Sequence, residues 1–393
     1  MTAEIVFDLC VIGAGMFGSS AARHASANPS IKVCLVGPSE PTDAELSKER
    51  YLDLTTMKVE LPEYLTIHQL ARFFLNMPLG DTRNWKNYQG LLFMILLAVF
   101  CGEKNGEFML NFLESASDVT LVELSNETFQ KEGDEQILFD DNGGGHISPR
   151  NFVVAQKKVA HLQGCHIVDS VACSTETLEN GVHVVSTESN EVICAKRLLI
   201  ATGAFVNMKD LSVLRPLKVT RCKETVVYLK LQKEEAQRLS AMPSIIYAKE
   251  NNGTGIGAYI LPPIKYPDGE YYIKIGDSPF VRDDVELKTL EELRKWYLSE
   301  GNEKMVKTHV ELLTELIPGL KYTDIHRRTC ATCETPSGLP YIERVSPTVT
   351  VAIAGNGKGA KFSDEVGRIA AELSITGKWD SELSPNLFQA IFE

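Results

Sequence analysis

A glycine-rich hexapeptide directly after a short apolar run constrains the fold of this chain most strongly. The run Val6–Ile12 is typical of a strand buried on both faces. Ser19–Ala27 suits a helix, and Lys32–Val36 is a second buried strand, so the segment has the length of one βαβ unit. The hexapeptide between the first strand and the helix is Gly13-Ala14-Gly15-Met16-Phe17-Gly18.

Each glycine of this motif has its own task. Gly13 allows a tight turn out of the strand, Gly15 allows the backbone to approach a pyrophosphate, and Gly18 allows the helix to pack closely on the sheet. The helix that begins near Met16 and Phe17 offers unpaired N–H groups and a positive dipole end to phosphates. A glycine-rich turn without a ligand is the alternative, but the flanking strands favour nucleotide binding.

The ribose-binding residue is expected where the second strand ends. An acid normally occupies that place, and here the strand continues as Val36-Gly37-Pro38-Ser39-Glu40. Glu40 is the first candidate and Ser39 the second, while a solvated loop acid is an equally good interpretation of Glu40.

The nucleotide pattern stops after one unit and resumes later, which favours FAD over NAD. Ser148 and Pro149 are typical of an N-cap and first helical residue, in a helix that ends near Gln163. After further strands, Leu199–Ala204 resembles the strand and turn that recross the FAD site in flavoprotein oxidoreductases. Thr202 and Gly203 are therefore expected beside a dinucleotide.

The intervening segments predict a separate sheet-based domain. Leu287–Leu316 predicts two helices, Thr348–Ala354 a buried strand, and Ser363–Leu373 a helix. The β-rich segments of the expected second domain are Thr225–Leu231, Ser244–Ala248, Gly257–Leu261 and Tyr271–Ile275.

Composition excludes several classes of function. The formal charge of −12 argues against a nucleic-acid surface, because phosphate binding needs a basic face. The longest apolar run, Leu91–Cys101, is too short to span a bilayer and predicts a buried strand or core segment. Nine cysteines without a regular framework indicate a reducing, cytoplasmic compartment. No His or Cys cluster has metal-ligand spacing.

Two C-terminal segments, with the glycine motif, resemble the D-amino-acid-oxidase superfamily, and within it the monomeric sarcosine oxidase group. The segments are Thr335–Ile342 and Val351–Ser363. The resemblance extends over residues 5–38, 143–210 and about 220–385, and fails across roughly 41–90. It implies an α/β (α+β) fold, in which a bipartite Rossmann-like FAD-binding domain (1–40, 143–210 and 326–393) accompanies a β-sheet substrate domain (41–142 and 211–325).

The resemblance implies a role for Cys330 at the flavin. In this family a cysteine at the matching place is linked through a thioether to the flavin 8α carbon. Arg327 and Arg328 could favour the reactive thiolate. Two alternatives remain, namely a thiol beside non-covalent FAD, and a redox or metal-binding CxxC pair with Cys333. The same resemblance places the backbone of Val171 against the adenine, with apolar strand filler as the alternative.

Lys274 matches the family lysine that lies over the flavin ring. A fixed ammonium in a dry site stabilises the negative charge that develops on O2 during reoxidation of the flavin. The alternative for this residue is a lysine on the wet face of an edge strand.

The glycine loop and Lys361 complete the expected flavin site. Gly355, Gly357 and Gly359, with Asn356 and Lys358 between them, imply a loop backbone against the flavin. Lys361 matches the family lysine that binds the substrate carboxylate and favours the reduced, anionic ring. Lys358 stands where sarcosine oxidases have a histidine, and a solvated loop lysine is its alternative.

Arg83 is the remaining substrate-binding candidate. Relatives carry a Gly-Asp-Thr-Arg-like loop after the second strand, and Gly80-Asp81-Thr82-Arg83 occurs here about forty residues later than expected. It is either the same loop behind an insertion or a chance match.

The resemblance therefore implies an FAD-dependent amine or amino-acid oxidase, with Lys274 and Lys361 as catalytic residues. Its partners are a small amine or amino acid and O2, with hydrogen peroxide as product. The protein is expected to be monomeric and to bind neither membranes nor nucleic acids. The alternatives are an FAD dehydrogenase with another acceptor, and a catalytically weak flavin-binding homologue.

Overall fold

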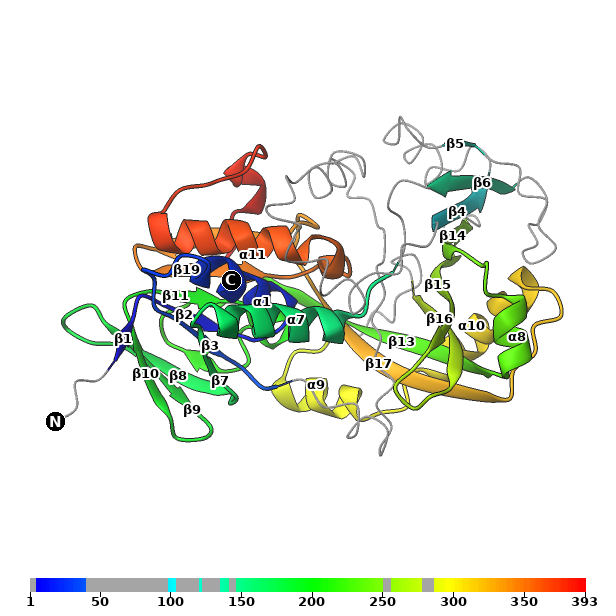
Figure 1. The fold of residues 1–393 in the computed structure, drawn as a ribbon, viewed down its shortest axis with the longest axis horizontal. Helices are drawn as coiled ribbons and strands as arrows, with labels where there is room; N and C mark the ends of the chain where they lie inside the picture. Colours follow the sequence, from blue (N-terminus) through cyan, green and yellow to red (C-terminus); the bar gives the residue numbers. More distant parts are fainter. Residues whose placement is uncertain are drawn as a thin grey trace.

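The chain forms two sheet-based parts side by side, which Figure 1 shows at the left and right. The computed structural model describes residues 5–39, 98–103, 120–121, 135–140, 146–249, 256–277 and 286–393. The left part contains the N-terminal segment and the C-terminal helix, and the right part contains the long strands of the middle of the chain.

A six-stranded, mainly parallel sheet forms the centre of the first part, in the order β18-β19-β11-β2-β3-β7. Three helices, α1 (Met16–Ser26), α7 (Pro149–Leu162) and α11 (Gly359–Thr376), cover one face (Figure 1). The strands are β2 (Leu9–Ile12), β3 (Val33–Val36), β7 (His166–Val168), β11 (Leu198–Ile200), β18 (Tyr341–Ser346) and β19 (Val349–Ile353).

A five-stranded sheet, in the order β1-β10-β9-β8-β12, belongs to the same part. Its apolar side chains form a second core with the other face of the six-stranded sheet. Strand β2 is therefore buried on both faces: Leu9 and Val11 join the helix-side core, and Cys10 and Ile12 join the other. The strands are β1 (Val6–Phe7), β8 (Ala172–Thr177), β9 (His183–Thr187), β10 (Val192–Ala195) and β12 (Asp210–Leu211).

The second part is an eight-stranded sheet, in the order β17-β13-β16-β15-β14-β4-β6-β5. Its strands are β4 (Ala98–Glu103), β5 (Thr120–Leu121), β6 (Glu135–Asp140), β13 (Thr220–Leu231), β14 (Ser244–Lys249), β15 (Ile256–Lys265), β16 (Tyr271–Asp277) and β17 (Asp324–Glu334). The accompanying helices are α8 (Lys233–Arg238), α9 (Leu290–Tyr297) and α10 (Glu303–Leu316). Two short 3₁₀ turns, η1 (Gly203–Phe205) and η2 (Pro385–Phe388), lie elsewhere.

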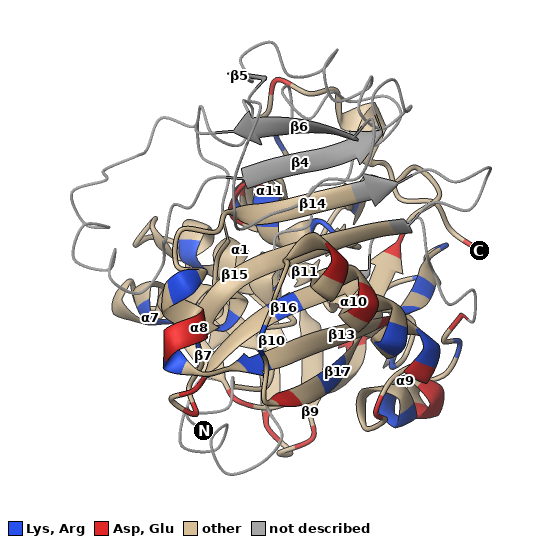
Figure 2. Cartoon of the chain, turned by 90° about the vertical axis from the view of Figure 1, so that its right-hand side faces the viewer, with Lys and Arg blue, Asp and Glu red and all other residues tan. Residues whose placement is uncertain are grey.

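The two faces of the eight-stranded sheet have different coverings. Val227, Leu229 and Ile273 belong to a core that includes apolar side chains of α8 and α10. Figure 2 shows these two helices in front of the sheet, with α1 and α11 behind it. Because side chains alternate along a strand, Tyr228 and Lys274 belong to the opposite face, on the side of the six-stranded sheet.

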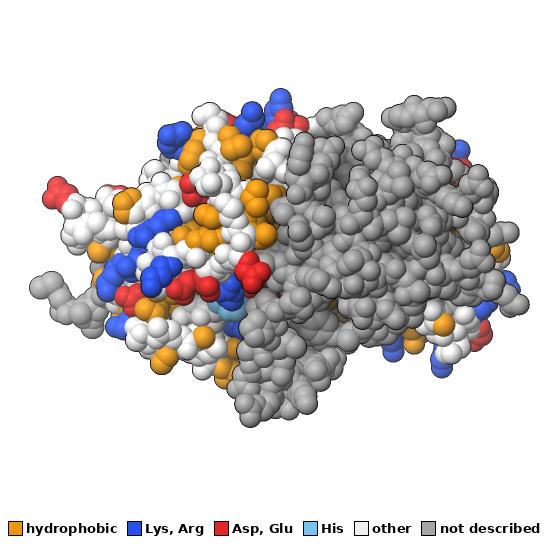
Figure 3. Space-filling model, turned by 90° about the horizontal axis from the view of Figure 1, so that it is seen from above, with side chains coloured by type: hydrophobic (Ala, Val, Ile, Leu, Met, Phe, Trp, Pro, Cys, Tyr) orange, Lys and Arg blue, Asp and Glu red, His pale blue; other side chains and the backbone are white. Residues whose placement is uncertain are grey.

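Charges of both signs are mixed on the described part of the surface in Figure 3, where lysine and arginine side chains lie beside acidic ones. This mixture differs from the continuous basic field that a nucleic-acid backbone attracts. Within the described ranges, no helix combines the length and apolar character needed to cross a bilayer.

The predicted α/β fold class is confirmed, with differences in local detail. The predicted strand Val6–Ile12 is two strands, because β1 pairs with β10 in the five-stranded sheet whereas β2 pairs with β3 and β11 in the six-stranded sheet. Ser148 caps α7 as expected, and its hydroxyl accepts a hydrogen bond from Asn151 N. Strand β17 pairs within the eight-stranded sheet and crosses the domain boundary that we expected at 326, and the boundaries remain a proposal.

Candidate functional site

A cavity of about 910 Å³ opens where β2, β3 and β11 end. Its walls include the residues directly after these strands, namely Gly13, Gly37 and Ala201. The carboxyl ends of parallel strands are the usual place for a ligand in an open α/β sheet. Nine of the predicted cofactor-binding residues line it: Gly13, Gly15, Met16, Phe17, Val171, Thr202, Gly203, Gly355 and Gly359.

The three glycines of the N-terminal motif have different surroundings. Gly13 has φ +109°, and a Cβ there would lie 2.3 Å from Ala201 O. A Cβ on Gly18 would lie 1.7 Å from Gly13 O, so this glycine allows α1 to pack against the turn. A Cβ on Gly15 would meet no atom of the described part of the chain within 4 Å. Gly13 and Gly18 are therefore required by the fold, whereas Gly15 leaves space in the cavity wall.

The polar groups of the cavity fit a dinucleotide. Gly15 is the N-cap of α1, so the unpaired N–H groups and the positive dipole end of this helix lie at the cavity. Thr202 also lines the cavity, and its Oγ1 is buried without a hydrogen-bond partner among the described residues. A buried hydroxyl without a partner is costly, and a ligand with polar oxygens would satisfy it.

The loop after β19 is held in an unusual conformation. Ala354, Asn356 and Gly357 have φ values of +69°, +49° and +69°, a region that L-residues seldom adopt. Asn356 stabilises the loop, since its N donates to Cys333 O at 3.0 Å and its Oδ1 accepts from Thr335 N at 2.8 Å. The predicted loop residue Asn356 thus joins the loop to β17, while Lys358 is the N-cap of α11.

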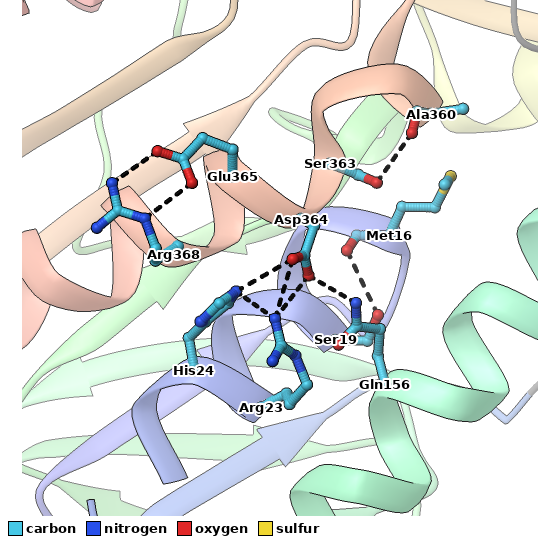
Figure 4. Close-up of polar contacts among 10 residues, drawn as sticks. All are labelled: Met16, Ser19, Arg23, His24, Gln156, Ala360, Ser363, Asp364, Glu365 and Arg368. Carbon is cyan, nitrogen blue, oxygen red and sulfur yellow. Dashed lines mark hydrogen bonds and ion pairs between the residues drawn. The ribbon is translucent and has the colours of Figure 1, made fainter. Parts of the chain in front are cut away.

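A polar network joins the three helices that cover the first sheet (Figure 4). Asp364 of α11 accepts hydrogen bonds from Arg23 of α1 at 2.8 Å and from Gln156 of α7 at 2.7 Å, and His24 Nε2 lies 3.5 Å from its carboxylate. Burial raises the pKa of Asp364, but the hydrogen bond from His24 and the charge of Arg23 outweigh burial and hold the pKa well below its usual range. Burial lowers the pKa of His24.

Replacing Asp364 with alanine is expected to destabilise the protein by about 1–3 kcal/mol, because Arg23 and Gln156 lose a charged acceptor. Asp364→Asn keeps one acceptor oxygen and should lose less stability.

The stability of the protein should also fall with decreasing pH. The pKa of His24 is lowered in the folded protein, so protonation of this side chain favours the unfolded state below about pH 6.5. The pKa of Asp364 is lowered as well, so the stability that its carboxylate contributes is lost as the pH falls below about 4. Urea unfolding of the wild-type protein and both variants between pH 2 and pH 8 measures these effects, and an unchanged stability of Asp364→Ala would contradict them.

The register of the eight-stranded sheet places Cys330 and Lys274 on one face. Glu224 pairs with Cys330, and Tyr228 pairs with Lys274. Glu224 and Tyr228 are four residues apart on β13, so they and their partners share a face. This is the face opposite α8 and α10.

Lys274 is an almost fully buried cation. The side chain is 1% exposed, and its Nζ lies 5.5 Å from the ring centroids of both Tyr228 and Tyr259. Tyr259 fits there because Gly276 lies opposite it, where a Cβ would be 2.3 Å from the Tyr259 hydroxyl oxygen. Two aromatic faces stabilise an ammonium that has lost most of its water. The interpretation of Lys274 as a lysine on a wet edge is therefore wrong.

Cys330 is next to a cavity residue in the sequence but does not line the cavity itself, and it does not form a CxxC pair. Trp296 Nε1 donates to Cys330 O at 2.7 Å, and the adjacent Ala331 lines the cavity. Cys333 is three residues along the same strand and so points to the other face, where burial raises the pKa of its thiol to about 12. A redox or metal-binding pair of Cys330 and Cys333 is excluded by this geometry. Arg327 forms ion pairs with Glu300 and Glu303.

Comparison with known proteins agrees with this geometry. The family model for FAD dependent oxidoreductases matches residues 111–373. The chain belongs to this family. FAD is accordingly its cofactor, and the chain is an oxidoreductase.

Relatives of this FAD-dependent oxidoreductase include monomeric sarcosine oxidase from Streptomyces avermitilis, which is 25% identical over 94% of each chain. Solved structures with the same fold include NikD, an amino acid oxidase of nikkomycin biosynthesis (TM-score 0.72, 13% identity, 98% of each chain). Another is L-proline dehydrogenase from P. horikoshii (TM-score 0.68, 16% identity, 98% of this chain and 97% of the other).

Several predicted site residues in the described part of the chain do not line the cavity, among them Lys274 and Cys330. Ser39 is exposed, and its N donates to Asp169 Oδ1 at 2.6 Å. Lys361 belongs to the first turn of α11 with its Nζ buried. Glu40 and Arg83 lie outside the described residues. Among those that are described, no group of three His, Cys, Asp or Glu side chains is placed to hold a metal ion.

Many further cavity residues were absent from the prediction, among them Phe205, Arg294, Tyr297 and Ala331. Arg294 and Tyr297 belong to α9, which we predicted as a helix without a place beside the FAD cavity. A capping box of Thr289 and Glu292 marks the start of this helix in the sequence. Its contact with β17 and η1 is a tertiary feature that no local pattern indicates.

Proposed function

We propose that this flavoprotein oxidises the C–N bond of a small amine or amino acid, as sarcosine oxidases do, with O2 as the electron acceptor. The observation that carries this proposal is the buried cation Lys274, on the sheet face it shares with Cys330. The names of the relatives, a sarcosine oxidase and an amino acid oxidase, support the substrate class.

The reaction balances as an oxidation with hydrolysis. The substrate C–H and N–H bonds break and a C=N bond forms, with FAD supplying the two-electron chemistry. Water then hydrolyses the imine to a carbonyl compound and an amine or ammonia, and O2 is reduced to hydrogen peroxide. Lys274 would stabilise the negative charge that develops on oxygen, because a fixed cation in a dry site costs no reorganisation.

Lys361 is the proposed partner of a substrate carboxylate. Its Nζ is buried in the first turn of α11, directly after the loop whose residues Gly355 and Gly359 line the cavity. A buried cation favours an anionic group in its neighbourhood. Arg83, outside the described residues, remains the second candidate for this carboxylate.

The electron acceptor is tested by peroxide yield. In air, an oxidase should form one hydrogen peroxide for each amine consumed, measured with a coupled peroxidase. Amine oxidation that proceeds only with an added quinone or dye would instead favour a dehydrogenase, the activity in the name of one structural neighbour.

We further propose that Cys330 binds FAD covalently. Acid precipitation of the wild-type protein should leave the yellow colour in the pellet, and Cys330→Ala should release it to the supernatant. Cys333→Ala is the matched control and should keep the colour in the pellet, since Cys333 points to the other face. Colour in the supernatant of the wild-type protein would contradict the covalent link.

A monomeric, cytoplasmic protein is proposed as well. The described cysteines form no disulfide bond, which agrees with a reducing compartment. Light scattering of the purified holoprotein measures the oligomeric state, and a dimer mass would contradict the first part of this proposal.

A further inference from the structure

Helix α9 has one face on β17 and another on the FAD cavity. Leu293 and Trp296 are buried in a cluster with Ala331 of β17. Leu290, Arg294 and Tyr297 line the cavity instead. Leu290, Arg294 and Tyr297 are spaced by four and three residues, so these cavity-lining side chains lie on one face of the helix. This helix therefore forms a cavity wall that is separate from the glycine motif of α1.

Two contacts hold this wall in place. Trp296 Nε1 donates to Cys330 O at 2.7 Å and fixes α9 to β17. Tyr297 stacks on Phe205 of η1, with ring centroids 6.3 Å apart and an angle of 12° between the rings. Because Arg294 lies one helical turn before Tyr297, its position along the cavity is fixed by the same contacts.

Three of the described residues that line the cavity are charged, namely Glu188, Lys209 and Arg294. Lys209 Nζ lies 3.0 Å from Glu188 Oε1, so these two charges compensate each other. Among the described residues, no carboxylate forms an ion pair with Arg294. Within this described lining, the guanidinium of Arg294 is therefore the charge that remains for a ligand.

We propose that Arg294 binds the pyrophosphate of FAD. The pyrophosphate is the anionic part of this cofactor, and the N–H groups at the start of α1 compensate its charge only in part. A guanidinium presents several donors in a planar fork that matches phosphate oxygens. The pyrophosphate would thus lie between the first turn of α1 and the cavity face of α9, and α9 would link FAD binding to the strand that carries Cys330.

Binding of ADP and adenosine to the full-length apoprotein tests this proposal, because the two ligands differ in the phosphates. Apoprotein is prepared by expression under riboflavin limitation and titrated by calorimetry. Arg294→Met should weaken ADP binding about 10- to 100-fold and leave adenosine binding within about twofold. Arg294→Lys should recover part of the ADP affinity. Lys295→Met is the control. Arg294 and Lys295 are both exposed residues of α9, and replacing Lys295 removes the same charge outside the cavity lining.

Three results would overturn the proposal. Equal losses of ADP and adenosine affinity would place Arg294 at the adenosine rather than the phosphates. An unchanged ADP affinity in Arg294→Met would exclude a phosphate contact. An equal loss in Lys295→Met would indicate a general effect of charge. None of these titrations contains an oxidisable amine substrate, so their outcome is independent of the proposed reaction.

Discussion

Replacing Lys274 with methionine is expected to slow the reoxidation of the reduced enzyme by O2 about 10²- to 10³-fold. The side chain is 1% exposed, so its charge is little screened by water. Negative charge develops on oxygen in this step, and methionine fills a similar volume without a charge. Reduction of the enzyme by an amine should change only a few-fold, because that step does not transfer charge to oxygen.

Stopped-flow mixing of the reduced variant with O2 measures this effect. The control is Lys230→Met, since Lys230 lies on the neighbouring strand β13 and pairs with Glu270 at the surface. An unchanged reoxidation rate in Lys274→Met would show that another group stabilises the charge on oxygen. A slow reduction step with normal reoxidation would assign Lys274 to the substrate instead.

The second large effect separates two glycines of the same motif. Gly13→Ala should destabilise the apoprotein by about 3 kcal/mol or more, because the residue has φ +109° and its Cβ would lie 2.3 Å from Ala201 O. In Gly15→Ala, the new Cβ would have no described atom within 4 Å. The free energy of unfolding should therefore change by about 1 kcal/mol at most, which is the cost of alanine at an N-cap. Its methyl group would instead occupy the cavity and weaken FAD binding about 10- to 100-fold.

Urea unfolding of the two apoproteins and their titration with FAD measure these effects. The expected pattern is a loss of stability in one variant and a loss of affinity in the other. Equal stability losses in both would contradict the assignment of Gly15 to the cavity wall. Normal FAD binding by Gly15→Ala would show that the backbone there does not approach the cofactor.

The elements with strong local signals could be predicted from the sequence. The N-terminal βαβ unit follows from a buried strand and a glycine motif, and α7 follows from Ser148 and Pro149. Helix α11 begins at Gly359, four residues before the predicted start at Ser363. Glycine seldom favours a helix, so local propensity does not indicate this first turn, and a Cβ on Gly359 would make only an ordinary contact with Phe17 at 3.5 Å.

The sequence does not predict which residues share a face of the eight-stranded sheet. Lys274 and Cys330 share a face because of the register that β13 forms with β16 and β17. Alternation within one strand does not indicate which residues of distant strands lie opposite each other. For the same reason Tyr228 and Tyr259 were absent from the prediction, although they surround Lys274. The cavity role of Arg294 depends on the contact of α9 with β17 and η1, which is also non-local.

Anaerobic titration of the yellow holoprotein with N-methyl and cyclic amino acids tests the central claim most directly. At least one of these amines should bleach the absorbance of the bound flavin with one equivalent of amine per FAD, and readmission of air should restore the spectrum with release of hydrogen peroxide. A flavin that stays oxidised with every amine of the panel, while dithionite still reduces it, would contradict oxidation of a C–N bond by this protein.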